Sequence, residues 1–441
     1  MNNKVVLFGA GRSSIYLIEY LQKYLQEKGG ELHIYDRDKK NILERIKDCP
    51  ISHAHSINIT DVELRKAAIS TADVVISMLP AALHMLVAED CLELNKHFAT
   101  ASYISDEMEA LNDKVKEKGL VFLNELGVDP GIDHLSAMEI INNLKALGAE
   151  ITEFESFTGG LVTPECEDNP WKYKFTWNPR NVVLAAQGGA VKFIHNGKYK
   201  YIPYQKVFRR TEIVTIPEYG KYEGYANRDS LTYRETYGLE TVKTMYRGTF
   251  RRPGFGKAWN CFVQLGATED SYTLENSENM TNRDFINTFL AYHPTDSVEL
   301  KLRMSLGIQQ DDVELWEKLE WLGIFKDTKI GLANATPAQI LEHILKQKWE
   351  LKPEDKDMII MWHKFVYLLN GEEKTHSTYL IVKGENEDHT AMAKTVGLPL
   401  GMGVRLILEN KIPQKGVILP IYKEVYKPIL EELKEWGVEF Y

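Results

Sequence analysis

Short apolar runs and amphipathic stretches alternate from residue 4 to about residue 126. The runs are rich in Val, Ile and aromatic residues, and they read KVVLFG, ELHIYD, ADVVISML, HFATAS and VFLNEL. Helical candidates lie between them, including residues 14–27 and 82–95. Short buried runs bounded by polar helices indicate a parallel sheet covered by helices on both faces. The pattern therefore predicts a doubly wound α/β fold for this part of the chain.

The pattern changes beyond residue 150. Segments rich in Gly, Pro and aromatic residues, such as SFTGGLVTPECEDNPWKYKFTWNPR, are interspersed with alternating strands such as KTMYRGTF and STYLIVKG. These features predict a mixed α+β domain. From about residue 268 to 357 the sequence turns helical, with NRDFINTFLAYH, DDVELWEKLEWLGIF and TPAQILEHILKQKW separated by polar breaks, and this indicates a small all-α insert.

Size and charge narrow the class of protein. With 441 residues, 44% of them hydrophobic, the chain can bury a large core divided among two or three domains. The formal net charge of −10 argues against a nucleic-acid partner or an anionic membrane surface, which are held by a surplus of Lys and Arg. Anionic small ligands need only a few arginines in one pocket, and the basic run MYRGTFRRPGFGK offers such a concentration.

Cysteine placement and hydropathy bear on location and metals. The four cysteines are scattered, with no CxxC pair and no histidine spacing typical of zinc, so we expect reduced thiols and no metal site. No apolar stretch approaches the roughly 20 residues that span a bilayer. The first strand begins at Lys4, which leaves no room for a cleavable signal, so we expect a cytoplasmic protein without a membrane partner.

The stretch VVLFGAGRSS is typical of a dinucleotide-binding turn with one substitution. Gly9 permits the tight turn out of the strand, and Gly11 lets the backbone approach a pyrophosphate at the start of the next helix. Ser14 stands where a third glycine normally allows close packing. Asp36 follows 25 residues after Gly11, at the end of ELHIYD, where an acid can bind a ribose diol. The alternatives are a purely structural glycine turn and a solvated Asp36.

We expect the nucleotide to be held at the ends of several predicted strands. The expected cofactor-binding residues in this part of the chain are Gly9, Gly11, Arg12, Ser13, Ser14, Asp36, Arg37, Asn58, Leu79 and Pro80.

Six segments resemble those of one known family. ASYISDEM, NELGVDPGIDH, SFTGGLVTPECEDNPWKYKFTW, YANRDSLTY, YRGTFRRPGF and TVGLPLGMGVRLIL occur in the same order as in the saccharopine reductases, the glutamate-forming saccharopine dehydrogenases. The resemblance implies an N-terminal Rossmann domain, residues 1–128, with a returning C-terminal helix at about 389–411. It also implies an α+β substrate and dimerisation domain formed by residues 129–267 and 358–388 with the tail 412–441, and a helical insert at 268–357.

The resemblance implies an activity as well. The family oxidises the secondary amine of saccharopine with NAD or NADP and hydrolyses the imine to L-glutamate and 2-aminoadipate 6-semialdehyde, in either direction. Saccharopine has three carboxylates and one amine, so its pocket needs bidentate cationic groups and polar groups near the amine. A homodimer is also implied.

Individual residues are implied by the family motifs. Ser102 and Tyr103 resemble a substrate-contacting pair, and Asp129 and Pro130 resemble a second contact. By their chemistry Asp129 and Tyr103 suit the catalytic roles, because Asp129 can hold the amine or a water and Tyr103 can donate a hydrogen bond. The remaining implied residues are Arg228 as a carboxylate-binding arginine, Thr249 and Arg251 as a third substrate contact, and Asn178 as a cofactor contact.

Each implied role has a structural alternative. Asp129 before Pro130 suits a helix N-cap, Tyr103 suits the core, and Arg228 suits a solvated loop. We expect His134 to be a satisfied histidine in the first turn of a helix.

Two positions depart from the family pattern. Thr158 stands where family members commonly have cysteine, so no thiol is available there. Asp36-Arg37 stands where the family tends to have an Arg-Thr pair suited to NADP, so Asp36 favours NAD against the family's habit.

Three other functions remain open from the sequence. One is an imine-reducing dehydrogenase acting on another amino-acid or polyamine adduct. Another is a homospermidine-synthase-like transferase, which Arg228 and Arg251 disfavour because a dicationic substrate needs carboxylates. The third is a non-catalytic nucleotide sensor.

Overall fold

The structure is a computed structural model that describes residues 3–185, 187 and 189–441. The chain divides into two compact units. The first comprises the chain up to Glu150 together with Leu369–Gly371 and Leu380–Tyr441, and the second comprises Ile151–Leu368 and Glu372–Tyr379.

The first unit is built on a seven-stranded parallel sheet in the order β15-β6-β5-β4-β1-β2-β3. Adjacent strands β1 and β4 mark the point where the strand order reverses, which is where α/β sheets of this kind bind ligands. All five predicted apolar runs form strands. The strands are β1 (Lys4–Phe8), β2 (Glu31–Asp36), β3 (Ser52–Ser56), β4 (Val74–Ser77), β5 (His97–Thr100), β6 (Val121–Leu123) and β15 (Gly416–Ile418).

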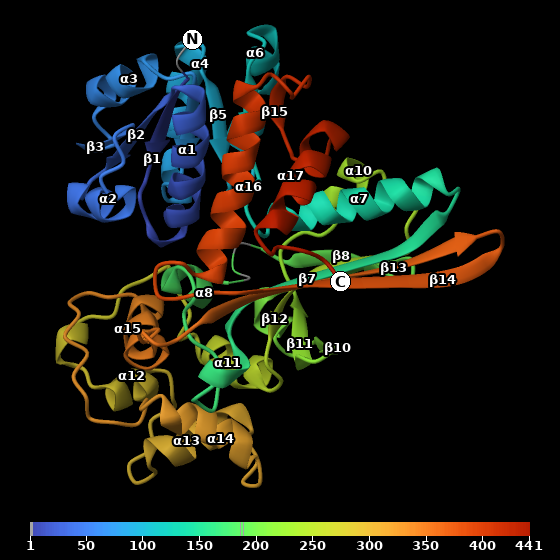
Figure 1. Ribbon diagram of the computed structural model, residues 1–441. Helices are drawn as coiled ribbons and strands as arrows, with labels where there is room; N and C mark the ends of the chain where they lie inside the picture. Colours follow the sequence, from blue (N-terminus) through green and yellow to red (C-terminus); the bar gives the residue numbers. More distant parts are fainter. Residues whose placement is uncertain (1–2, 186, 188) are drawn as a thin grey trace. The chain divides into compact units, whose positions relative to one another are not determined.

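Helices pack against this sheet (Figure 1). The α-helices of the first unit are α1 (Ile15–Lys28), α2 (Lys39–Ile46), α3 (Val62–Ser70), α4 (His84–Glu93), α5 (Asp106–Glu109), α6 (Asn112–Glu117), α7 (Ile132–Ala146), α16 (Ala391–Leu408) and α17 (Lys423–Glu435). Between the sheet and the helices lie fully buried side chains such as Val6, Phe8, Val75 and Phe98. The doubly wound α/β fold predicted from the apolar runs is confirmed.

Helix α16 returns from the end of the chain to pack beside α1 (Figure 1). A Cβ atom at Gly397 would lie only 2.7 Å from the backbone nitrogen of Leu17, so a small residue is required for this approach. The helix is also the one element among the described residues whose length and composition would suffice to cross a membrane. Because 72% of its apolar window is buried within the structure, its apolar character is explained by core packing.

The boundaries of the first unit differ from the predicted ones. Strand β15 pairs with β6, so residues from the tail 412–441 belong to the first sheet and not to the α+β domain. Helix α7 also belongs to the first unit, although the sequence indicated a boundary at residue 129. A three-residue strand carries too little periodicity to be recognised without its partner.

The second unit contains an eight-stranded sheet of mixed direction. Its main order is β10-β11-β12-β7-β13-β14, and β8 pairs with both β12 and β9. The central pair β12 and β7 is parallel, whereas β11 runs antiparallel to both of its neighbours, β10 and β12. The strands are β7 (Glu150–Val162), β8 (Val191–His195), β9 (Lys198–Ile202), β10 (Thr211–Ile216), β11 (Gly220–Ala226), β12 (Thr244–Arg251), β13 (Asp357–Leu369) and β14 (Glu372–Lys383).

The helical segment predicted at 268–357 lies within the second unit. It contributes to an aromatic core in which Trp171 packs edge-on against Trp349 and donates its indole N–H to the carbonyl of Lys318 at 2.7 Å. The helices of this unit are α8 (Pro179–Val183), α9 (Tyr204–Val207), α10 (Tyr233–Thr236), α11 (Phe255–Leu265), α12 (Asn282–Thr288), α13 (Val298–Leu306), α14 (Val313–Trp321) and α15 (Pro337–Trp349).

Candidate functional site

The turn after β1 combines one glycine that the fold requires with one that it does not. Gly9 has a φ of +97°, and a Cβ there would lie 2.8 Å from the carbonyl oxygen of Met78. Gly11 has an ordinary φ of −73°, and a Cβ there would meet nothing within 4 Å. The protein's own packing therefore does not explain Gly11, whereas a pyrophosphate lying against the backbone would.

Ser14 takes over the packing role of the missing glycine. Its side chain is fully buried, and its hydroxyl donates to the carbonyl of Gly11 at 2.8 Å. The hydroxyl is thus satisfied inside the turn, so serine is compatible with the tight approach of helix and strand.

Asp36, the last residue of β2, accepts a hydrogen bond from the glycine turn of the neighbouring strand β1. Its Oδ2 accepts from the backbone N–H of Ala10 at 2.8 Å, and its Oδ1 accepts from the N–H of Asp38 at 3.1 Å. Asp36 is therefore not merely a solvated turn residue. Arg45, which the sequence did not single out, donates through Nε to the carbonyl of Gly11 at 3.3 Å and brings a cation to the same turn.

The other predicted cofactor residues of the first unit follow the carboxyl ends of its strands. Parallel strands share one carboxyl edge, so the residues after β1, β2, β3 and β4 lie along the same edge. These residues are Arg12 and Ser13 after β1, Arg37 after β2, Asn58 after β3, and Leu79 and Pro80 after β4. Asn178 lies in the second unit, where its side chain accepts from the N–H of Arg180 and caps α8; its contact with a cofactor stays a prediction.

Tyr103 and Asp129 meet after β5 and β6. The phenolic hydroxyl of Tyr103 donates to Oδ1 of Asp129 at 3.0 Å. The peptide bond between Asp129 and Pro130 is cis. Helix α7 begins at Ile132 with Gly131 as its N-cap residue, so the alternative reading of Asp129 as the helix cap is wrong.

Two residues that sequence reasoning missed, His84 and Glu125, form hydrogen bonds with Ser102 and Ile104, the neighbours of Tyr103 in the chain. His84 lies between two serines: its Nδ1 is 2.7 Å from Oγ of Ser77, and its Nε2 is 2.7 Å from Oγ of Ser102. Burial lowers the pKa of His84 to about 4, so its imidazole is neutral near pH 7 and holds Ser102 by a hydrogen bond.

Glu125 is the second missed residue. Its Oε1 accepts from the N–H of Ile104, and its Oε2 lies 2.9 Å from Nε2 of His134. This contact satisfies His134 in the first turn of α7, as predicted. An acid two residues after the buried run VFL was the available signal, because it lies at the carboxyl end of a strand, where Asp36 also lies.

The second unit places Thr158, Thr249 and Arg251 on one face of its sheet. Thr158 and Thr249 are neighbours in the register of β7 and β12, and Arg251 follows two residues after Thr249. The hydroxyl oxygen of Thr158 is buried without a hydrogen-bond partner among the described residues.

Arg251 is buried, with 3% of its surface exposed. Its guanidinium lies 4.8 Å from the ring centre of Tyr173 and 5.3 Å from that of Phe255. It donates to the carbonyl of Phe250, but within the described part of the chain it forms no ion pair, and its Nε has no hydrogen-bond partner. Glu223 is its cross-strand neighbour and instead accepts from the N–H of Gly256. A buried positive charge without an ion-pair partner is unfavourable, and an anionic ligand would offset its desolvation penalty.

Arg228 is exposed in the loop after β11, with a φ of +51°. The four cysteines are free, and burial raises the pKa of Cys261 to about 12, so this thiol is protonated at neutral pH.

Comparison with family models covers nearly the whole chain. The model described as the saccharopine dehydrogenase NADP binding domain matches residues 5–123, and the model described as the saccharopine dehydrogenase C-terminal domain matches residues 127–438.

Individual relatives agree with the family models. The chain is 34% identical over 99% of its length to the mitochondrial alpha-aminoadipic semialdehyde synthase of Rattus norvegicus, but it spans only 47% of that protein, about half its length. It is 30% identical to the saccharopine dehydrogenase [NADP(+), L-glutamate-forming] of Schizosaccharomyces pombe, covering 98% of this chain and 97% of the relative. The solved apo structure of saccharopine dehydrogenase (L-Glu forming) from Saccharomyces cerevisiae aligns with a TM-score of 0.88 at 28% identity, over 100% of this chain and 99% of that one.

Proposed function

Because the chain belongs to the saccharopine dehydrogenase family, we propose that it oxidises saccharopine with a nicotinamide dinucleotide. The overall reaction converts saccharopine, water and NAD(P)⁺ into L-glutamate, 2-aminoadipate 6-semialdehyde, NAD(P)H and a proton. The C–N bond to the lysine-derived carbon is oxidised to an imine, and water then cleaves that imine.

The buried guanidinium of Arg251 carries this proposal. Its charge has no carboxylate partner among the described residues, and its planar group can bind a substrate carboxylate through two hydrogen bonds. Saccharopine supplies three carboxylates, and Arg228 is the second guanidinium proposed to bind one of them. A polyamine substrate would place a cation against Arg251, which is unfavourable.

Asp129 and Tyr103 are the residues proposed for the proton transfers. The carboxylate of Asp129 can hold the substrate amine or an ordered water, and the Tyr103 hydroxyl, 3.0 Å from that carboxylate, can donate to the oxygen formed when water adds. Ser102, held by neutral His84, offers a hydroxyl that accepts or donates a hydrogen bond beside Tyr103. Thr158 cannot titrate near neutral pH and contributes at most a hydrogen bond.

The nucleotide site fits a nicotinamide dinucleotide. The open space at Gly11 and the carboxyl edge beside β1 and β4 are suited to the pyrophosphate, and a bound NAD(P)⁺ would supply the hydride acceptor. Asp36 favours the ribose diol of NAD, whereas the relative from Schizosaccharomyces pombe is named for NADP(+). Arg37 and Arg45 are cations near this position that could accept a 2′-phosphate.

The direct experiment follows the absorbance of reduced cofactor when purified protein is mixed with saccharopine and NAD⁺ or NADP⁺. We expect reduction with at least one cofactor. If neither is reduced, another imine-forming substrate, a transferase or a nucleotide sensor becomes the better account.

The proposal extends to assembly and location. A homodimer is expected from the family resemblance and a cytoplasmic location from the cysteine placement and hydropathy, although the rat relative is named as mitochondrial. Light scattering of the purified protein gives the mass in solution, and a mass of about 50 kDa, that of one chain, would contradict the dimer.

A further inference from the structure

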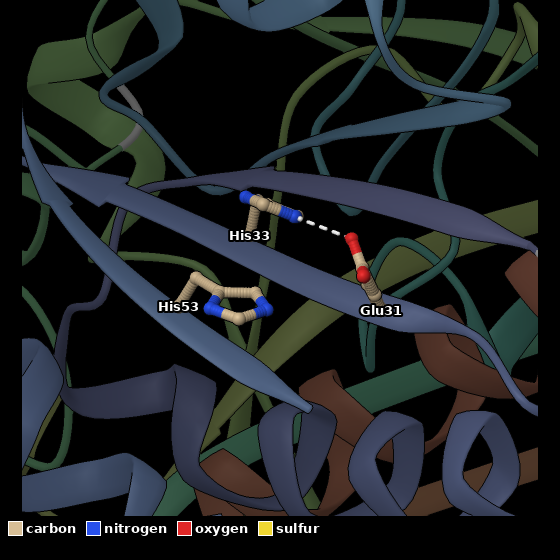
Figure 2. Close-up of side chains that lie close together, drawn as sticks. All are labelled: Glu31, His33 and His53. Atoms are coloured by element: carbon tan, nitrogen blue, oxygen red, sulfur yellow. Dashed lines mark hydrogen bonds and ion pairs between the residues drawn. The ribbon is translucent and has the colours of Figure 1, made fainter. Parts of the chain in front are cut away.

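Three histidines lie on one face of β2 and of the edge strand β3. In the parallel register His33 lies beside His53, and Tyr35 lies beside His55. Residues two apart on a strand share a face, so these rings gather on one side of the sheet, and Glu31 joins them at the start of β2. Figure 2 shows Glu31, His33 and His53 close together.

The three labelled side chains have the spacing of metal ligands. Each offers one ligand atom, and the three atoms lie within 4.8 Å of one another. Nε2 of His33 is 3.1 Å from Oε2 of Glu31, and ligand atoms around a tetrahedral zinc ion lie about 3.3 Å apart. The Glu31 side chain is 49% exposed, so it can rotate to bring its carboxylate to the same ion as the two imidazoles. Water can occupy a remaining coordination position.

The third ligand candidate, His53, lies half-buried beside His33. Within the described part of the chain the ring of His53 has no hydrogen-bond partner, although it packs 4.5 Å from the ring of His33. A ring nitrogen of His53 is therefore available to bind a metal ion.

His55 provides the support that metal-binding histidines usually have. Its Nε2 lies 3.0 Å from Nδ1 of His33, and its ring stacks on Tyr35 at 4.4 Å. When Nδ1–H of His33 donates to His55, the lone pair of His33 Nε2 is directed toward Glu31 and is free to bind a cation.

We propose that Glu31, His33 and His53 form a binding site for a divalent transition-metal ion of the zinc type, with His55 orienting His33. Two imidazoles and one carboxylate are donors that suit Zn²⁺ and exclude a Mg²⁺-type oxygen cage. The bound ion joins β2 to β3 in addition to the backbone ladder and the contacts of His55 with His33 and Tyr35. The sequence predicted no metal site because these histidines belong to two strands and only the register brings them together.

The test titrates the full-length protein with Zn²⁺ alone against a competing chelator, and with Co²⁺ to record the visible absorption of the bound ion. We expect one saturable site per chain and a higher unfolding temperature with Zn²⁺. Glu31→Gln and His53→Asn should each weaken Zn²⁺ binding by at least about tenfold, and His55→Phe by about tenfold through loss of orientation.

Matched controls separate this site from adventitious binding by surface histidines. His376→Asn changes an exposed histidine on β14, and Glu44→Gln changes an exposed acid on α2, so neither should alter Zn²⁺ affinity. Because Glu31 is half-exposed, Glu31→Gln is expected to fold even if a histidine variant does not. Equal Zn²⁺ affinity in Glu31→Gln and Glu44→Gln, or an absence of saturable binding, would overturn the proposal.

Discussion

Arg251 is the residue whose environment most needs a ligand. We expect Arg251→Lys to raise the Michaelis constant for saccharopine and leave that for the cofactor unchanged, because lysine keeps the charge but loses the planar fork and its stacking on Tyr173. The loss should be about 2–4 kcal/mol in kcat/KM. Arg252→Lys is the matched control, since Arg252 already pairs with Glu167.

Arg228 is the other predicted carboxylate contact. Arg228→Lys should also raise the Michaelis constant for saccharopine, measured by the same steady-state kinetics. Equal effects of either substitution on the constants for saccharopine and cofactor would remove that arginine from the substrate pocket.

Asp129 and Thr158 differ in what they can contribute to turnover. Thr158→Ala should lower kcat by at most about tenfold, roughly 1.4 kcal/mol, because only a hydrogen bond is lost. Asp129→Ala should cost about a hundredfold or more, because a group that moves or holds a proton is removed. Steady-state kinetics of both variants give the comparison. A more damaging Thr158→Ala would mean that Asp129 takes no part in the chemistry.

Single residues could be predicted from the sequence where they belong to recognisable motifs. Gly9, Gly11 and Asp129 belong to such motifs; Gly9 has the positive φ that its tight turn requires, whereas the cofactor role of Gly11 and the catalytic role of Asp129 stay predictions. His84 and Glu125 act through partners that are up to 21 residues away in sequence and meet only at the sheet edge, so no local pattern could reveal them.

The glycine turn between β1 and α1 is the element on which the proposed cofactor site depends. Gly11→Val should abolish cofactor binding without unfolding the protein, because the side chain would occupy the space of the pyrophosphate and its Cβ meets no protein atom within 4 Å. Calorimetric titration with cofactor, together with thermal unfolding, measures both effects. Unchanged affinity would show that the turn is only structural.

The end of β2 should set the choice of nucleotide. If Asp36 selects NAD by repelling a 2′-phosphate, Asp36→Asn should shift the ratio of kcat/KM values toward NADP by about tenfold. Asparagine retains an oxygen that can accept from the N–H of Ala10, so the turn keeps its hydrogen bond. A wild-type protein that already prefers NADP tenfold would show that this interpretation of Asp36 is wrong.

Elements were predictable where burial imposed a pattern. Four of the five apolar runs became strands that are buried on both faces, and the fifth, β2, alternates between one buried and one partly exposed face. Strand β3, SHAHS, was missed because it is a polar edge strand, and β15 was missed because three residues have no measurable period. The start of α7 differed because Gly131, and not Asp129, precedes its first turn.

At the scale of the molecule, each unit holds a separate part of the proposed chemistry. The first has the glycine turn and the Tyr103–Asp129 pair, and the second has the buried Arg251. Family models match both parts, and this end-to-end likeness supports the activity more strongly than the glycine turn alone.

The most direct test of the central claim identifies the products of saccharopine oxidation. The secondary amine has two C–N bonds, and cleavage at one yields L-glutamate and 2-aminoadipate 6-semialdehyde, whereas cleavage at the other yields lysine and 2-oxoglutarate. Purified protein is incubated with saccharopine and NAD⁺ or NADP⁺, and amino acids are quantified beside reduced cofactor. We predict one L-glutamate for each cofactor reduced and no lysine; formation of lysine, or no reduction of either cofactor, would contradict the account.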